Sequence, residues 1–470
     1  MLPAQQIGGE FASPWIQVML GHQLATRKLG IFHGLYGLAS VMQPIELPLA
    51  TADRAKTLET LLDVRTTLPF TGYELSPWPG GRTEGLRRLA AFDVSAYART
   101  RNLVGDASGV SLLGPYIRHG LITLSECRAT AIRKSGGNPP VKFLQELAWR
   151  EYYQRVYAQL GDAIMHTNLE SPKVELGNRP LTDDIRFGTT GLACMDENIN
   201  ELRETGYMYN HARMWVASYI IHHRKVAWQL GAQMFLQHLL DGDPASNSLG
   251  WQWIASTYSH KPYLFDQGNV QRFSDHCSRC SAARNGRCPF REYIDIPPAR
   301  EFSKPLPMAQ KSQSVDIVDD GRVPDLLWVH GDYIDVPANA ALSAYPNIPA
   351  VFILDTTLAT SRKISLKRFG FLYESVSEAF GRHPAGGRIF IGDPVDVLSS
   401  HMDCKHIATT NTPAGRFHEI RNGVEGKGIT VACHTTPRFV PESGPVPNRF
   451  MKWWKTVEDD VLTLQPRLLS

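Results

Sequence analysis

Helical spacing of apolar residues dominates the chain up to about residue 295. In residues 82–92 and 122–132 the apolar positions recur every three to four residues, which predicts amphipathic helices. Residues 141–164 predict a long helix, and residues 195–240 predict further helices rich in Met, Trp and Ile. Alternating or continuous strand patterns are scarce before residue 300. We therefore expect the first part of the protein to be mostly helical.

A different pattern follows. Short apolar runs recur in DLLWVHG, PAVFILD, GRIFIGD, KHIATT and GITVACH, and helix-like segments (366–380 and 394–402) lie between them. Alternation of strands and helices predicts a parallel sheet with crossover helices. Before these runs, residues 294–313 are rich in Pro, Ser, Lys and Gln, which is typical of an exposed linker.

These patterns divide the chain into segments. A chain of 470 residues is too long for one ordinary core, so two or three domains are expected. Residues 1–75 carry no lasting periodicity and form an N-terminal extension. Residues 76–295 form the helical domain, 296–322 the linker and 323–470 an α/β domain. The predicted fold class is multidomain α and α/β, with an all-helical domain followed by a Rossmann-like α/β domain.

Composition narrows the class of protein only modestly. Apolar residues make up 43% and charged residues 20% of the chain, as in globular proteins. The net charge of +3 permits a local basic groove but does not by itself indicate nucleic-acid binding. The sequence has neither an apolar run of roughly 20 residues nor the pattern of a signal peptide. We therefore expect a cytoplasmic protein without a membrane partner.

An unusual helical face indicates a ligand pocket. Residues 146, 149, 150 and 153 share one face and carry Glu, Trp, Arg and Tyr, an odd set for packing alone. Such a face suits a flat polar ligand, since Trp stacks while Arg and Glu form hydrogen bonds.

A second set of candidate residues lies in 205–265. Arg213 lies in an apolar helix and needs a partner, for which Asp241 or Asp243 is the candidate. These aspartates are equally typical of helix caps, and Trp251 and Trp253 of core packing.

Four motifs in order carry a resemblance to a known family. They are SLLGPYIRHGLITLSEC, ELAWREYY, TGYMYNHARM and LLDGDPASNSLGWQW. They resemble segments of the FAD-binding domain of photolyases and cryptochromes, and the resemblance covers about residues 80–275. It implies a U-shaped FAD in the helical domain, with Arg213 and Asp241 paired over the isoalloxazine ring. The residues implied to bind FAD are Tyr97, Ser111, Arg150, Asn210, Arg213, Asp241, Asp243 and Asn247.

The resemblance also implies a reaction. In the repair enzymes of this family, positions matching Glu146, Trp149 and Trp253 contact a flipped-out pyrimidine dimer, and Asn247 faces N5 of the flavin. Trp251 and Trp228 match the first two members of a tryptophan chain that photoreduces the flavin. The implied function is blue-light-driven electron transfer from reduced FAD that splits pyrimidine dimers, a lyase reaction, with damaged DNA as the partner.

Departures from the family pattern keep other functions open. His211 stands where many dimer-repair enzymes carry Arg, and the tryptophan chain looks short. Both favour a cryptochrome-type photoreceptor that signals to a protein partner. A light-independent flavoprotein is a third alternative. The family also places its α/β antenna domain first, whereas here it follows the helical domain. This displaced order leaves the antenna chromophore unassigned.

Clustered cysteines indicate a metal site. Cys277, Cys280 and Cys288 have the spacing C-x2-C-x7-C. Cys194 resembles in position the remote ligand of the bacterial iron–sulfur branch of this family. Four thiolates suit a [4Fe–4S] cluster, with a zinc ion as the chemical alternative and free buried thiols as the other interpretation.

Overall fold

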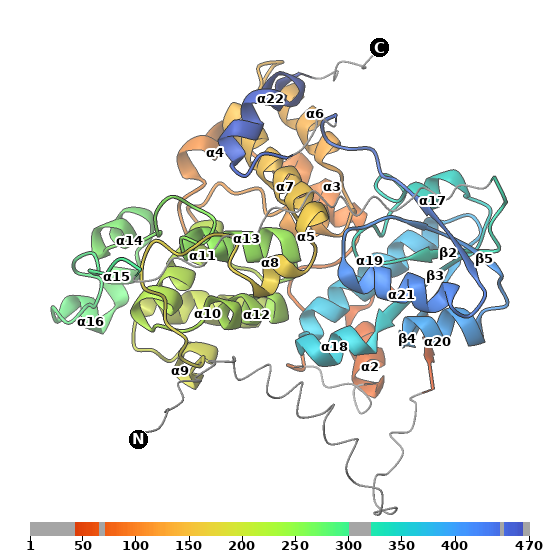
Figure 1. Cartoon of the computed structure of the whole chain (residues 1–470), viewed down its shortest axis with the longest axis horizontal. Helices are drawn as coiled ribbons and strands as arrows, with labels where there is room; N and C mark the ends of the chain where they lie inside the picture. Colours follow the sequence, from red (N-terminus) through yellow and green to blue (C-terminus); the bar gives the residue numbers. More distant parts are fainter. Residues whose placement is uncertain (1–42, 65–70, 300–320, 442–445, 464–470) are drawn as a thin grey trace, which may run out of the picture. The chain divides into compact units, whose positions relative to one another are not determined.

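Helices fill the chain between Arg82 and Arg284 (Figure 1). The structure is a computed structural model that describes residues 43–64, 71–299, 321–441 and 446–463. Within these residues the predicted helical part is confirmed. Its helices are α3 (Arg82–Ala91), α4 (Val94–Thr100), α5 (Gly114–Arg118), α6 (Leu124–Lys134), α7 (Val141–Leu160), α8 (Ala163–His166), α9 (Asp183–Arg186), α10 (Ala193–Thr205), α11 (Asn210–Ser218), the π-helix η3 (Tyr219–His223), α12 (Trp228–His238), α13 (Pro244–Ile254), α14 (Gln267–Phe273), α15 (His276–Arg279) and α16 (Ser281–Arg284).

Local sequence signals set the ends of several helices. Thr123 and Glu126 form a capping box at the start of α6. The α7 helix ends at Leu160, before the predicted 164, because Gly161 has a φ of 57° that other residues rarely adopt. Asp243 accepts a hydrogen bond from the Ser246 backbone N–H at 3.0 Å and so begins α13. These ends fix α7 and α13, which contact each other.

The predicted apolar runs after residue 322 are strands of one sheet. They are β2 (Leu326–Val329), β3 (Ala350–Asp355), β4 (Gly387–Gly392), β5 (His406–Thr410) and β6 (Thr430–His434). Their pairings are parallel, in the order β4-β3-β2-β5-β6. The winding reverses between β2 and β5, which makes the carboxyl ends of these two strands a topological switch point.

One strand was not expected from the sequence. Residues Ile45–Leu47 form β1, which pairs antiparallel with β4 and gives a mixed sheet of six strands among the described residues. The sequence analysis found little strand signal before residue 300, because three residues are too few to display periodicity. The helix α2 (Arg54–Asp63) packs against α19. The described residues of the segment 1–75 thus contribute to the sheet part, while residues 1–42 lie outside the described part.

Helices of different lengths connect the strands of the sheet. They are α17 (Ala340–Ala344), α18 (Thr356–Arg362), α19 (Leu366–Arg382), α20 (Pro394–Asp396), the π-helix η4 (Val397–His401) and α21 (Gly415–Glu425). The α19 helix packs on β3 and β4. Most of the predicted linker 296–322 lies outside the described residues.

The last helix, α22 (Phe450–Leu462), packs on α7 rather than on the sheet (Figure 1). Its apolar residues Trp453 and Val457 are 1% exposed. The Arg128 guanidinium of α6 donates a hydrogen bond of 2.9 Å to the carbonyl oxygen of Asp460. The C-terminal end of the segment 323–470 therefore lies among the helices of the segment 76–295.

Separate apolar cores hold the helices and the sheet. The helical core surrounds Trp215 and Ile199, both 0% exposed. The sheet core surrounds Val351 and Ile407, also 0% exposed. In the part of the chain that the structure describes, every helix is too short or too polar to cross a membrane.

Candidate functional site

A cavity of about 540 Å³ lies among α4, α5, α7, α11, α12 and α13. This volume is within the roughly 300–1,000 Å³ typical of ligand pockets. Of the residues predicted to contact flavin or lesion or to carry electrons, all but Trp228 line it. They are Tyr97, Ser111, Glu146, Trp149, Arg150, Asn210, Arg213, Asp241, Asp243, Asn247, Trp251 and Trp253.

Arg213 of α11 forms an ion pair with Asp241, which follows α12. Its Nη2 lies 2.9 Å and 3.1 Å from the two carboxylate oxygens, and its Nε donates to the Met208 carbonyl oxygen at 2.8 Å. Gly114 makes room for the pair, since a Cβ at this position would lie 2.6 Å from Oδ2 of Asp241. The residue pattern left Asp241 and Asp243 as alternative partners of Arg213, and the resemblance implied Asp241, which is the partner in the structure.

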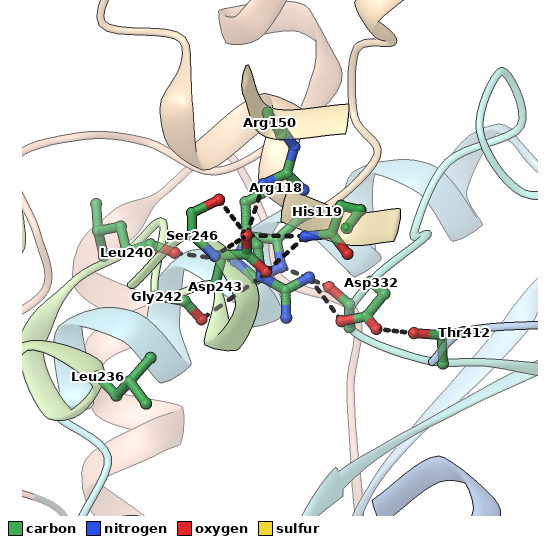
Figure 2. A network of polar contacts seen from close by, with 12 residues as sticks. Arg118, His119, Arg150, Leu236, Leu240, Gly242, Asp243, Ser246, Asp332 and Thr412 are labelled. Atoms are coloured by element: carbon green, nitrogen blue, oxygen red, sulfur yellow. Dashed lines mark hydrogen bonds and ion pairs between the residues drawn. The ribbon is translucent and has the colours of Figure 1, made fainter. Parts of the chain in front are cut away.

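Asp243 is the centre of a buried polar network (Figure 2). Its carboxylate lies 3.1 Å from Nη1 of Arg150 and accepts hydrogen bonds from Nε2 of Gln154 at 2.8 and 2.9 Å. The Ser246 hydroxyl donates a further bond of 2.6 Å. Burial by itself would raise the pKa of Asp243. The charges of Arg150 and Arg118 and the bonds from Ser246 outweigh burial and hold the pKa below its ordinary value. Asp243 therefore caps α13, as one interpretation predicted, but its ion pairs are with Arg150 and Arg118 and not with Arg213.

Glu146 is held by two cations at the cavity. Its carboxylate lies 3.2 Å from Arg101 and 2.9 Å from Lys142, one turn earlier on α7. The Arg101 contact was missed in the sequence, because this residue follows α4 and is distant from α7 along the chain. The carboxylate is thus fixed in place at a site lined by aromatic side chains.

Trp149 has one face covered by an aromatic residue of the C-terminal helix. The rings of Trp149 and Phe450 stack with centroids 3.8 Å apart and an interplanar angle of 12°. Trp253 of α13 packs beside Tyr263 at 5.8 Å. Since both tryptophans also line the cavity, each presents a supported aromatic surface there. The apolar spacing of Phe450, Trp453, Trp454 and Val457 was the sequence signal that could have revealed α22.

The predicted electron-transfer residues lie on neighbouring helices. Trp251 of α13 is 3% exposed and packs edge-on against Phe235 of α12 at 5.0 Å. A Cβ on Gly231 would lie 2.2 Å from Cη2 of Trp251, so glycine permits this approach of the ring to α12. Trp228, one helical turn before Gly231, is buried outside the cavity, and its Nε1 donates to Asn168 Oδ1 at 2.8 Å.

The remaining predicted residues complete the wall. Asn247 donates a hydrogen bond of 2.9 Å from Nδ2 to the Ala232 carbonyl oxygen and ties α13 to α12. Burial raises the pKa of the Tyr97 hydroxyl above its ordinary value. Next to Ser111, Leu112 has a φ of 55°, a strained conformation that concentrates at functional sites. His211 does not line the cavity: its ring packs edge-on against Trp215.

The four predicted metal-ligating cysteines come from separate segments. Cys194 lies on α10, Cys277 on α15, Cys280 at its end and Cys288 beyond α16. The α10 helix contacts α15, and Cys277 and Cys288 pack against the apolar core that contains Cys194. Burial and the neighbouring thiols raise the pKa of Cys194. Among the described residues, no three or more His, Cys, Asp or Glu side chains are placed to hold a metal ion. The described residues therefore do not show either of the predicted sites at these cysteines, the [4Fe–4S] cluster or the zinc ion.

Comparison with known families defines the class of this domain. Residues 143–279 match the family model of the FAD binding domain of DNA photolyase. This part of the chain is thus similar to the photolyase/cryptochrome family, in the segment where its motifs predicted the resemblance. The match includes α7, α11, α12 and α13 and ends before the sheet part.

Individual relatives agree with this assignment. The deoxyribodipyrimidine photo-lyase of Vibrio cholerae is 35% identical over 185 residues, 37% of this chain and 38% of that protein. That of Neurospora crassa is 31% identical over 203 residues, 40% of this chain and 33% of that protein. A cryptochrome DASH of Gloeobacter violaceus is 28% identical over 226 residues, 45% of each chain. The chain therefore spans between a third and a half of the length of these relatives.

Two solved structures are matched at a low overall similarity. A Synechocystis cryptochrome is matched with a TM-score of 0.38 at 23% identity, over 44% of this chain and 46% of that chain. An archaeal photolyase from Sulfolobus tokodaii, solved with two FAD molecules, is matched with a TM-score of 0.34 at 26% identity, over 42% of this chain and 45% of that chain.

Proposed function

We propose that this protein binds FAD in the cavity between α7 and α13 and uses light to split pyrimidine dimers in DNA. The observation that carries the proposal is the convergence of the Arg213–Asp241 pair, Asn247, Trp149 and Trp253 on one cavity in the photolyase-type domain. When bound, FAD would supply the light-driven electron donor. The protein would hold the cofactor and the lesion close together.

The residues present fit a flavin nucleotide. A planar guanidinium braced by a carboxylate, as in Arg213 and Asp241, offers a fixed charge to a flat ring. The strained turn at Leu112 and the small residue Gly114 leave backbone near the cavity. Asn247 adds an amide whose position is fixed by its bond to α12.

The lesion would enter on the side of Trp149 and Trp253, which pack against Phe450 and Tyr263. A pyrimidine dimer stacks and pairs poorly in DNA, so flipping it out of the duplex costs less than flipping a normal base. Stacking on Trp149 and Trp253 contributes about 1–3 kcal/mol per base. Glu146, held by Arg101 and Lys142, would orient the flipped bases by hydrogen bonding.

The test is repair by the purified full chain loaded with FAD. A dimer-containing oligonucleotide is incubated in blue light or in the dark, and the ultraviolet absorbance of intact pyrimidines is followed. We expect recovery in light only, and its loss in a Trp253→Ala variant that still binds FAD. Flavin that is bound and photoreduced without repair would instead indicate the photoreceptor alternative. Bound flavin without any response to light would indicate a light-independent flavoprotein.

The stack between Phe450 and Trp149 gives a second prediction. Phe450→Leu keeps an apolar contact but removes the ring that fixes one face of Trp149. Aromatic pairs contribute about 0.5–1.5 kcal/mol beyond their buried area, which corresponds to a loss of affinity for dimer-containing DNA of roughly 2- to 12-fold. Fluorescence anisotropy with a labelled oligonucleotide measures this loss, while FAD content stays unchanged.

The neighbouring residue provides the control for this variant. Met451 is 53% exposed on the same helix, so Met451→Leu should bind dimer-containing DNA like the unmodified chain. Equal affinity of the Phe450 variant and this control would contradict the proposed support of Trp149.

The cysteines extend the proposal to a [4Fe–4S] cluster held by Cys194, Cys277, Cys280 and Cys288. Support comes from the contacts of α10 with α15 and of α15 with α16, which bring together the segments that carry the four cysteines. A cluster places four irons between its thiolates, so its ligands stand further apart than the four sulfurs around one zinc ion.

Iron and sulfide assays test the cluster. Cys194→Ser should lose most of the iron and sulfide of the purified chain. Cys127→Ser, a buried thiol of α6, should keep both. Undiminished iron in the Cys194 variant, or one zinc per unmodified chain and no iron, would refute the cluster.

A further inference from the structure

We propose that Asp332, on the sheet part of the protein, is a positioning residue for the flavin cavity and acts through Arg118 on Asp243. The inference rests on the proposed binding of FAD in the cavity. It gives the sheet part a role in tuning the site, independent of any antenna chromophore.

Arg118 connects two carboxylates from different parts of the fold (Figure 2). It is the last residue of α5, and its Nη1 lies 2.6 Å from Oδ1 of Asp332. Its Nε lies 3.8 Å from Oδ1 of Asp243 and 3.5 Å from the Gly242 carbonyl oxygen. The Arg118 side chain is 11% exposed and that of Asp243 is 5% exposed. At such burial, removing one charge changes the field on the others strongly.

Asp332 is itself fixed at the topological switch point of the sheet. It follows β2, and Thr412, which follows the adjacent strand β5, donates a hydrogen bond from its hydroxyl to Oδ2 of Asp332. Its backbone N–H donates to Nδ1 of His330 at 3.3 Å. Open α/β sheets bind ligands outside the carboxyl ends of their strands at this point. Here the Arg118 guanidinium from the helical part makes contact there.

A cation of the sheet part, Arg368, also binds the loop that carries Asp241 and Asp243. Arg368 of α19 is 5% exposed and donates from Nη2 to the Gly242 carbonyl oxygen at 2.8 Å and from Nη1 to that of Leu236. The His119 ring nitrogens lie 2.5 Å from the carbonyl oxygen of Gly331 and 3.0 Å from that of Leu240. Residues 240–243 are therefore connected to the sheet part directly by Arg368 and, to the segment after β2, through Arg118 and His119.

The charges explain how Asp332 influences the flavin cavity although it does not line it. Arg118 interacts with both Asp332 and Asp243. Asp332, on the side away from the cavity, neutralises much of the positive charge of Arg118. Asp332→Asn removes this balance and leaves Arg118 to interact with Asp243 alone, in competition with Arg150. The cavity then becomes more positive. A more positive environment stabilises the reduced, electron-rich flavin relative to the oxidised form.

The experiment compares Asp332→Asn with a matched variant from the same loop. Asp335→Asn also removes a buried carboxylate, but that carboxylate pairs with Arg382 and not with Arg118. The full chain is loaded with FAD, and three quantities are measured: the flavin reduction potential, the FAD dissociation constant and the midpoint of urea unfolding. We expect Asp332→Asn to shift the potential to more positive values and to change FAD affinity by about 2- to 30-fold. Asp335→Asn should leave the potential unchanged.

Milder variants keep the test informative if Asp332→Asn does not fold. Thr412→Val loosens the hold on Asp332 without removing its charge, so it should give a smaller change in FAD affinity. Asp332→Glu should restore most of the unmodified potential. An unchanged potential in Asp332→Asn, or an equal shift in Asp335→Asn, would overturn the inference while FAD is still bound. Failure of the unmodified chain to bind FAD would instead refute the proposed function, and the inference with it.

Discussion

Replacing Asp243 with alanine is expected to lower the free energy of unfolding by about 2–4 kcal/mol. The carboxylate caps α13, and its loss costs about 1 kcal/mol for the cap alone. The larger contribution comes from Arg150 and Gln154, which lose their shared acceptor in a buried setting. Arg118 keeps its pair with Asp332, which limits the total. Urea unfolding followed by circular dichroism measures the change.

Two further variants separate these contributions. Asp243→Asn retains a good capping side chain but removes the charge, so it should lose about half as much stability. Asp183→Asn changes an aspartate whose side chain is 85% exposed, and we expect a change within about 0.5 kcal/mol. A loss in Asp243→Ala no larger than in Asp183→Asn would show that the polar network does not stabilise the fold.

Replacing Arg213 with methionine is expected to weaken FAD binding by at least about 30-fold, or about 2 kcal/mol. Methionine keeps the volume of the side chain but leaves Asp241 as an uncompensated negative charge beside the bound ring. Arg213→Lys keeps the charge but loses the planar guanidinium, whose Nη2 contacts both carboxylate oxygens while its Nε donates to the Met208 carbonyl oxygen, so it should recover only part of the affinity. Titration of the FAD-free protein, followed by flavin fluorescence, gives the dissociation constants.

A second ion pair of similar exposure serves as the control. Arg224 pairs with Asp184 at 2.7 Å and does not line the cavity. Its side chain is 27% exposed, against 25% for Arg213. Arg224→Met should therefore bind FAD like the unmodified chain. Equal losses in the two variants would mean that the Arg213 effect reflects general destabilisation and not contact with the flavin.

Much of the secondary structure could be predicted because it depends on the spacing of apolar residues along the chain. The helices α3, α6 and α7 bury one set of positions every three to four residues. The parallel strands β2, β3 and β5 are buried nearly throughout and so appear as continuous apolar runs. Neither pattern needs knowledge of the partner element, since burial on one or both faces is enough to produce it.

The elements that were missed depend on distant partners. The strand β1 is only three residues long and exists through its pairing of Ile45 with Ile391. Phe450 acquires its place at the cavity only when α22 packs on α7. Isolated short segments do not reveal such contacts, because the stabilising interaction lies with residues far along the chain.

The sequence by itself determined the helical and strand segments and the set of chemical groups around the cavity, through motifs that resemble the FAD-binding domain of photolyases. The resemblance also implied the pair of Arg213 with Asp241, which the structure shows. Only the tertiary structure decided that Asp243 pairs with Arg150 and Arg118. It alone brought Asp332 of the sheet to the same network. The reason is physical. Burial patterns are properties of neighbouring residues, whereas an ion pair depends on a few ångströms of distance between segments that the sequence separates.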